Sequence, residues 1–335
     1  MKINPDFIWK DNHGREINYL RLAITDRCNL RCQYCMPEEG IAYEPKDSLL
    51  TYEEMIRMVQ VLAGLGISKV RITGGEPLVR KDAVPFMKAL KQVKGLHSLH
   101  LTTNGTLTFP YLEELQPYLS SINLSLDSLQ REKFFQITRR DNFKEVWKSL
   151  EKIVALGIPL KVNMVVMAAW NMDEIIPMAK LAEKLPIVVR FIEEMPFNGQ
   201  NNPDGRGYVN DQDIYEILMM HFPDMITLPG SVGQTAETYH VPGFVGNLGV
   251  IAAYTRTFCG SCNRIRVTPS GMVKTCLYDQ GIFNIRDIIR SGATDEDIQT
   301  AFIEAVAHRH KNGWEAERNR FLTSPFSESM STIGG

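Results

Sequence analysis

The sequence has 335 residues, of which 44% are hydrophobic, enough for a large core and more than one domain. Its net charge of -2 and pI of about 6.4 exclude a strong overall attraction to nucleic acid or anionic lipid. We see no signal-peptide-like stretch and no segment apolar enough to span a bilayer, so we expect a cytoplasmic protein without membrane or nucleic-acid partners.

Short β-like segments alternate with helical patterns along the first two thirds of the chain. The predicted strands are 19–25, 69–75, 98–104, 121–127, 160–167 and 187–193. The helical stretches between them are 52–65, 83–91, 110–119, 143–156 and 173–185. Glycines at positions 66, 95 and 157 stand where helix C-caps belong. This alternation predicts an α/β fold, a partial (βα)6 TIM-type barrel, with a doubly wound sheet as the alternative.

The predicted strands share a second pattern, with apolar residues at one parity and polar residues at the other. Because successive strand residues point to opposite faces, one face should be polar on every strand, whereas an ordinary TIM barrel fills its interior with apolar side chains. Arg21, Arg71 and Lys161 fall on this polar face. Three fixed cations on one face indicate an anionic ligand better than three separate structural ion pairs do.

The alternation of predicted strands and helices ends at an Asn- and Gly-rich loop, residues 198–207. Beyond it, "CNRIRVTPSGMVKTCL" predicts two strands around a turn, and 295–307 predicts a helix. We therefore expect a barrel domain over 1–197 and a smaller C-terminal iron–sulfur domain over 198–335.

Six cysteines form two trios far apart in the sequence: Cys28, Cys32 and Cys35, and Cys259, Cys262 and Cys276. In a cytoplasmic protein such groups favour metal or redox chemistry over disulfides. A [4Fe–4S] cluster has four irons that each need a ligand, so three cysteines leave one iron open for another molecule. A zinc site completed by a distant ligand is the alternative, which the C-x3-C-x2-C spacing directly after a strand disfavours.

The motif "CNLRCQYC", with "TGGEP" at 73–77 after the second strand, resembles the signature of the radical S-adenosylmethionine superfamily. The resemblance implies a first [4Fe–4S] cluster on Cys28, Cys32 and Cys35, whose open iron binds S-adenosylmethionine. It also implies contacts to S-adenosylmethionine from Tyr34, Gly75, Ser125 and Met195. Outside this family, a tyrosine, a strand-end serine and a methionine at these positions would be ordinary core or surface residues.

The segment "FCGSCNRIRVTPSG" with Cys276 beyond it is similar to the C-terminal signature of the GTP 3',8-cyclase family, which begins molybdenum cofactor synthesis. The likeness extends to the final Gly-Gly pair. It implies a second [4Fe–4S] cluster on Cys259, Cys262 and Cys276, with the guanine of GTP at its open iron. The implied GTP contacts are Arg21, Arg71, Thr102, Lys161, Arg264 and Arg266. Such cations would replace the G-x4-G-K-[ST] loop, which the sequence lacks.

The implied reaction converts GTP to (8S)-3',8-cyclo-7,8-dihydroguanosine 5'-triphosphate, with no side chain as general acid or base. Its implied partners are an unidentified electron donor and, downstream, cyclic pyranopterin synthase; a homodimer is left open. Two alternatives remain. A radical S-adenosylmethionine enzyme that modifies peptides would carry more C-terminal cysteines and would not need a cationic face. A non-enzymatic iron–sulfur or zinc scaffold would not need the GGEP motif.

Overall fold

The computed structural model describes residues 8–195, 208–323 and 329–334. The chain forms two compact units. The first comprises residues 1–29, 42–101 and 259–335, and the second comprises residues 30–41 and 102–258. The domain boundary expected at residue 197 lies outside the described residues. None of the helices in the described ranges is long and apolar enough to cross a membrane.

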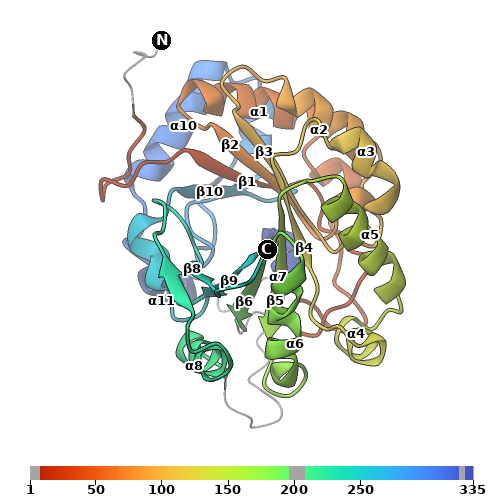
Figure 1. Cartoon of the computed structure of the whole chain (residues 1–335). Helices are drawn as coiled ribbons and strands as arrows, with labels where there is room; N and C mark the ends of the chain where they lie inside the picture. Colours follow the sequence, from red (N-terminus) through yellow and green to blue (C-terminus); the bar gives the residue numbers. More distant parts are fainter. Residues whose placement is uncertain (1–7, 196–207, 324–328, 335) are drawn as a thin grey trace. The chain divides into compact units, whose positions relative to one another are not determined.

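The first unit is built on strands in the order β12–β11–β10–β1–β2–β3, of which Figure 1 labels β10 and β1 to β3. The strands from β10 to β3 run parallel, and β11 and β12 pair antiparallel. The strand bounds are β1 (Tyr19–Ala23), β2 (Lys69–Thr73), β3 (Ser98–Thr103, begun in this unit), β10 (Arg264–Val267), β11 (Met272–Lys274) and β12 (Phe283–Asn284). The helices are α1 (Tyr52–Gly64), α2 (Ala83–Lys91), α9 (Ile285–Arg290), α10 (Asp295–Ala307), α11 (Gly313–Thr323) and α12 (Met330–Ile333).

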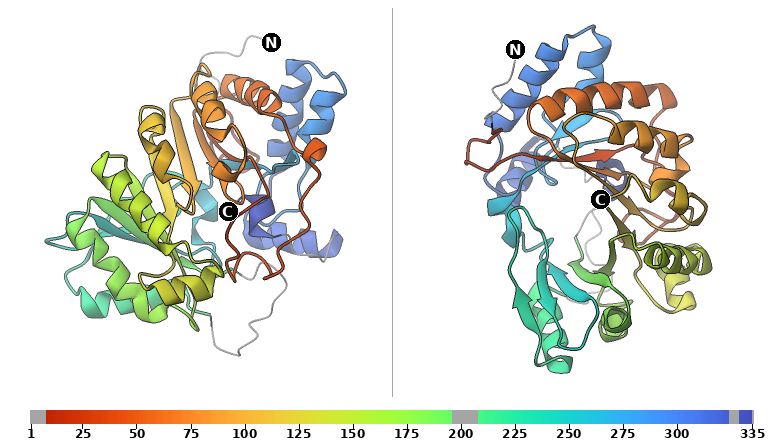
Figure 2. Two further views of the ribbon diagram at one scale, coloured as in Figure 1. Left: turned by 90° about the vertical axis from the view of Figure 1, so that its right-hand side faces the viewer. Right: turned by 45° about the horizontal axis from the view of Figure 1, so that its top comes forward.

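Helix α1 illustrates how the local sequence forms these elements. Thr51 and Glu54 make a capping box, in which each side chain accepts a hydrogen bond from the other residue's backbone N–H. One face of the helix is buried, at Met55, Met58, Val59 and Leu62. Gly66 follows with a φ of +108°, which suits glycine, so the predicted C-cap is confirmed. Helices α1 and α2 lie on the same side of β1 and β2 (Figure 2).

The second unit has strands in the order β4–β5–β6–β9–β8–β7. The strands from β4 to β9 run parallel, and β8 and β7 continue the sheet antiparallel. The strand bounds are β4 (Ser121–Ser125), β5 (Leu160–Val166), β6 (Ile187–Glu193), β7 (Ile226–Leu228), β8 (Glu237–His240) and β9 (Asn247–Ile251). The helices are α3 (Leu112–Leu115), α4 (Arg131–Thr138), α5 (Phe143–Ala155), α6 (Ile175–Ala179), α7 (Leu181–Lys184) and α8 (Asp211–His221).

The predicted α/β class, with six βα units and parallel strands, is confirmed, and each predicted strand begins at the expected residue. Two helices are shorter than predicted. Helix α3 ends at Leu115, just before Pro117, whose ring leaves no backbone N–H to continue the helical hydrogen bonds. The stretch 173–185 is divided into a 3-10 turn, α6 and α7 rather than one helix.

The C-terminal region contains the expected strand pair, β10 and β11, and the expected helix α10. Two of its strands also extend the parallel sheets. β10 pairs parallel with β1, and β9 pairs parallel with β6. The sequence pattern did not predict these pairings, because the local sequence of a short strand does not determine which distant strand it pairs with.

Candidate active site

The first cysteine trio lies on the loop that follows β1. All three thiols are half-buried, and the backbone N–H of Cys35 donates to Cys32 O at 2.9 Å, which makes a tight turn between them. Arg139 Nη1 supports the turn by donating to Met36 O at 3.2 Å. All six cysteines of the chain are in the described ranges, and none of them is disulfide-bonded. The loop therefore presents thiols that remain available for metal.

The GGEP segment after β2 runs directly against the start of this cysteine loop. Gly75 N donates to Thr25 O at 2.8 Å, and Glu76 N donates to Arg27 O at 2.9 Å. A Cβ on Gly75 would overlap Arg27 O and would lie 2.9 Å from Cys28 N. Only glycine permits this close approach of two backbones. The motif thus has a structural requirement that an ordinary glycine turn would not impose.

In the second unit, Tyr34 is oriented by a buried carboxylate. The Tyr34 hydroxyl donates to Asp127 Oδ2 at 3.0 Å, and Val165 N donates to Asp127 Oδ1 at 2.9 Å. Burial raises the pKa of Asp127 to about 6, although both hydrogen bonds oppose that shift. Sequence reasoning assigned Asp127 no role. Its signal was its position two residues after Ser125 on the polar parity of the fourth strand.

The other predicted contacts in the second unit are dispersed along its strands. Lys161 lies beside Asn123 in the β4–β5 register, and Ser125 lies beside Asn163. Thr102 Oγ1 is buried and has no hydrogen-bond partner among the described residues, as expected of a group reserved for a ligand. Met195 is half-buried and packs against a small apolar cluster of Ala236, Ile251 and Ala253.

The first unit brings four of the predicted GTP contacts together on one sheet face. Residues aligned in register on parallel strands, and of equal parity, lie side by side on that face. Strands β10, β1 and β2 place two such rows on it, Arg266–Arg21–Arg71 and Arg264–Tyr19–Lys69. We call this set of residues the arginine face. Arg21, Arg71, Arg264 and Arg266 were predicted from the sequence, and Tyr19 and Lys69 were not.

Tyr19 is the exception within this group of cations. Arg71 Nε donates to the Tyr19 hydroxyl at 2.8 Å, and Lys69 Nζ lies 4.5 Å from the centre of the Tyr19 ring. Burial would raise the pKa of this phenol, but Arg71, Arg21 and Lys69 together lower it to about 7. Tyr19 and Lys69 precede Arg21 and Arg71 by two residues, so the alternation that revealed the arginines could have revealed them too.

The arginines of this face repel one another. Burial, followed by the charge of Arg266, lowers the pKa of Arg21 well below its usual value. Burial and the charge of Arg264 likewise lower the pKa of Arg266 to about 10. A polyanion placed on the face would raise both pKa values again, because its negative charge would offset the repulsion among the arginines.

The second cysteine trio adjoins the arginine face at Arg264. Burial raises the pKa of the Cys262 thiol, but Arg264 and Arg309 outweigh burial and bring it to about 6. Burial and Asp279 raise the pKa of Cys276 to about 12. In the described part of the chain, no three Cys, His, Asp or Glu side chains converge as the ligands of a single metal ion do. A [4Fe–4S] cluster instead takes each thiolate on a different iron, and metal binding deprotonates all of them.

The last described residues of the chain return to the arginine face. Arg266 Nη1 donates to Gly334 O at 3.2 Å. Gly334 has a φ of +80°, and a Cβ there would lie 2.5 Å from Thr73 Oγ1 and 2.8 Å from Ala23 Cβ. The position therefore requires glycine for both its conformation and its space.

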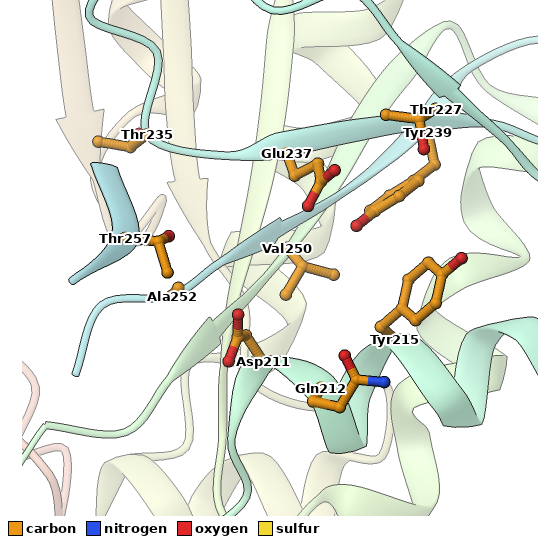
Figure 3. A pocket seen from close by; sticks show the side chains of 10 residues that line it. All are labelled: Asp211, Gln212, Tyr215, Thr227, Thr235, Glu237, Tyr239, Val250, Ala252 and Thr257. Carbon is orange, nitrogen blue, oxygen red and sulfur yellow. The ribbon is translucent and has the colours of Figure 1, made fainter. Parts of the chain in front are cut away.

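A cavity of about 270 Å³ lies in the second unit between α8 and the strands β7–β9 (Figure 3). Its polar lining includes Asp211, Glu237, Tyr215 and Tyr239, and none of the residues predicted from the sequence lines it. The Tyr215 and Tyr239 rings lie 5.5 Å apart. Asp211 has a structural role as well, because it belongs to the first turn of α8, where a carboxylate is favourable.

Two family models match the chain in succession. The model described as the radical SAM superfamily matches residues 22–182, and the model described as Molybdenum Cofactor Synthesis C matches residues 187–314. The first range contains the C-x3-C-x2-C loop and the GGEP segment, and the second contains the second trio. The βα units and these motifs thus define a protein of the radical SAM class, whose cofactors are S-adenosylmethionine and an iron–sulfur cluster.

Curated relatives narrow the class further. The GTP 3',8-cyclase of Syntrophomonas wolfei is 41% identical over 92% of this chain and 97% of its own length. The GTP 3',8-cyclase of Moorella thermoacetica is 38% identical over 97% of this chain and 100% of its own length. The Bos taurus molybdenum cofactor biosynthesis protein 1 is 41% identical, and the chain spans only 48% of that longer relative. The chain belongs to the GTP 3',8-cyclase family.

Solved structures agree with the fold. Streptococcus suis SuiB matches with a TM-score of 0.60 and 14% identity, over 82% of this chain and 66% of SuiB. The AdoMet-bound anSMEcpe matches with a TM-score of 0.59 and 15% identity, over 89% of this chain and 80% of that protein. At such identities the likeness shows the fold alone, and that fold is the one predicted.

Proposed function

We propose that this protein converts GTP to (8S)-3',8-cyclo-7,8-dihydroguanosine 5'-triphosphate, the first step of molybdenum cofactor biosynthesis. The observation that carries the proposal is the register of Arg266, Arg21 and Arg71 across β10, β1 and β2. Three guanidinium groups in a row suit a polyphosphate, which each can contact through two hydrogen bonds. The relatives from Syntrophomonas wolfei and Moorella thermoacetica, which the chain matches almost end to end, are named for this activity.

The first cluster is assigned to Cys28, Cys32 and Cys35, with S-adenosylmethionine at the open iron. When bound, the cluster and S-adenosylmethionine supply the one-electron chemistry that removes a hydrogen atom from the substrate. The surroundings of this loop suit a polar cofactor. Thr73 Oγ1 and Asp26 Oδ1 are both buried and lack a hydrogen-bond partner among the described residues.

Four residues are assigned to S-adenosylmethionine: Tyr34, Gly75, Ser125 and Met195. The hydrogen bond to Asp127 fixes the Tyr34 ring in one orientation, which prepares it to contact a flat base such as adenine. The missing side chain of Gly75 lets its backbone pack directly against Arg27 and Cys28, which holds the GGEP segment beside the cysteine loop where the cofactor is assigned. Met195 lies against a small apolar cluster, so its thioether suits an apolar part of the cofactor.

A second [4Fe–4S] cluster is assigned to Cys259, Cys262 and Cys276, with the guanine of GTP at its open iron. The low pKa of Cys262, which favours the thiolate, supports this assignment. The GTP contacts are assigned to Arg21, Arg71, Thr102, Lys161, Arg264 and Arg266. Fixed cations of this kind position the nucleotide for reaction, which is the main task left to the protein.

We assign residues 1–197 to S-adenosylmethionine and its cluster, and residues 198–335 to the second cluster and to GTP binding. The GTP site also takes Arg21, Arg71, Thr102 and Lys161 from the first of these regions. The reaction requires an external electron donor, and its product is the substrate that cyclic pyranopterin synthase consumes. A homodimer would be compatible with these assignments.

An anaerobic assay with GTP, S-adenosylmethionine and a chemical reductant tests the proposal. The expected result is a product that has the mass of GTP and resists release of the guanine base, together with 5'-deoxyadenosine. The variant Cys35→Ala should form neither, because its cluster would lose one of only three thiolate ligands. A reconstituted wild type that cleaves S-adenosylmethionine but never alters GTP would refute the proposed substrate.

A further inference from the structure

Two arginines far from the second trio in sequence hold its backbone. Arg15 Nη1 donates to Cys259 O at 3.0 Å. Arg309 Nη1 donates to Cys262 O at 2.8 Å, and Arg309 Nε donates at 2.9 Å to the carbonyl of the residue just before Cys276. The three cysteine segments are therefore tied to two guanidinium groups by direct hydrogen bonds.

Asp11 joins these arginines into one buried group. Arg15 Nε lies 2.6 Å and Arg309 Nη1 lies 3.3 Å from the same oxygen, Asp11 Oδ2. The exposed fraction of the Asp11 side chain is 0%, and those of Arg15 and Arg309 are 7% and 3%. One carboxylate between two guanidinium groups leaves a positive charge to be balanced in the interior. Arg309 Nη2 donates to Cys262 Sγ at 3.0 Å, so this guanidinium group lies directly against the sulfur of an assigned cluster ligand.

Arg309 uses every donor that its side chain has. Its five N–H groups serve the Asp11 carboxylate, the Cys262 thiol and three backbone carbonyls, those of Cys262, Arg264 and Thr275. A lysine could keep the charge at this position but not the planar set of five donors. Because all five N–H groups are used, only arginine can make this set of hydrogen bonds. Lysine, which keeps the charge, is therefore the conservative substitution that tests it.

We propose that Arg309 and Arg15, joined by Asp11, are positioning residues that hold the second trio in its cluster-binding arrangement, and that Arg309 tunes the cluster through its N–H···S bond to Cys262. The inference rests on the second cluster of the proposed function. A donor at a ligating sulfur stabilises the reduced, more negative cluster, so it raises the reduction potential. Neither arginine needs to touch the substrate for this role.

The test uses full-length protein that can hold only the second cluster, because three cysteines are replaced by alanine: Cys28, Cys32 and Cys35. After anaerobic reconstitution this parent should bind about four irons. Arg309→Lys is expected to retain at most half of them, with a lower midpoint potential and an altered electron paramagnetic resonance spectrum of the reduced cluster. Arg15→Lys is expected to lose less iron and to keep the potential, because Arg15 donates to the Cys259 carbonyl and not to Sγ.

Arg290→Lys is the matched control. Arg290 also donates to backbone carbonyls, those of Asp47 and Leu49, and to a carboxylate, that of Glu54, in the same unit. Its replacement should change neither the iron content nor the potential of the second cluster. If Arg290→Lys lost as much iron as Arg309→Lys, the loss would reflect a general destabilisation of the unit, and the inference would be overturned.

The remaining outcomes are also decisive. Full iron content, unchanged potential and an unchanged spectrum in Arg309→Lys would overturn the inference. If the apoprotein of Arg309→Lys shows no cooperative thermal unfolding, Arg15→Lys decides: iron loss at constant potential supports the positioning role, and parental iron content overturns it. A parent that binds no iron refutes the proposed second cluster and the inference with it, a result that does not involve the arginines.

Discussion

Binding of GTP to the arginine face should weaken as the pH rises above 7, because the hydroxyl of Tyr19 loses its proton in the free protein. Three cations next to this buried phenol, Arg71, Arg21 and Lys69, outweigh burial and lower its pKa to about 7. The charged groups that face it from the third strand, β10, are also cationic, Arg264 and Arg266. In protein without bound nucleotide, the ionised phenol is therefore expected to act as a counter-charge for the arginine face.

A bound triphosphate takes over that task. Its negative charges on the same arginines should return the pKa of Tyr19 to about 10, its ordinary value, so binding takes up one proton. The apparent affinity then falls with pH by a factor that reaches about 2 at pH 7 and about 100 at pH 9. Between these pH values GTP should bind about fifty-fold more weakly, a loss of about 2.3 kcal/mol in binding free energy.

The measurement is the dissociation constant of GTP for anaerobic holoprotein between about pH 6.5 and about pH 9. Tyr19→Phe keeps the ring beneath Lys69 and removes the titrating group. Titration of the nucleotide is common to both proteins and cancels in their ratio. Tyr52→Phe is the control, because burial raises the pKa of Tyr52 to about 12, out of this range. Equal pH dependence in wild type and Tyr19→Phe would refute the reasoning.

Three further predictions concern the proposed site. Cys276→Ala should preserve much of the S-adenosylmethionine cleavage but stop GTP cyclisation, and wild-type cyclisation would make the second trio structural. Replacing Arg264 and Arg266 with alanine should slow cyclisation more than tenfold, since each charged hydrogen bond contributes about 1.5–3 kcal/mol; unchanged turnover would deny them a role in binding. Gly334→Ala should lower the product formed per 5'-deoxyadenosine, because its Cβ would meet Thr73 Oγ1 at 2.5 Å. Gly292→Ala, at a φ of +88° with open space around it in the same unit, should leave that ratio unchanged.

The sequence predicted the elements whose cause is local. Strand β6, for example, covers Ile187–Glu193 as predicted, because the residues of the strand and those next to it determine its side-chain pattern and its ends. The arginines of β1 and β2 were found for the same reason, since parity along a strand assigns each side chain to a face. Tyr19 has the parity of Arg21 and was missed because a tyrosine in a strand is typical of core packing.

Arg309 could not have been found in this way. It is 47 residues from Cys262 in sequence, just beyond the end of α10, where a basic residue is typical of an exposed helix C-terminus. Its partners belong to Asp11, to the Cys262 segment and to the segment before Cys276, and only the folded chain brings them together. The composition of the sequence and the spacing of its motifs do not show that these segments meet at Arg309.

Arg309 differs in its surroundings from Arg21 and Arg266, although all three are arginines of the folded interior, and the difference indicates different functions. Arg309 is saturated by carbonyls, a carboxylate and a thiol, so adding a ligand would only break bonds that it already makes. Arg21 and Arg266 instead face other cations, and both burial and that repulsion lower their pKa values. A fold tolerates such a concentration of like charge where a ligand relieves it, and stability lost at a site of this kind is typical of function. The contrast supports the proposals that Arg309 holds the protein's own thiols and that Arg21 and Arg266 bind an anionic ligand.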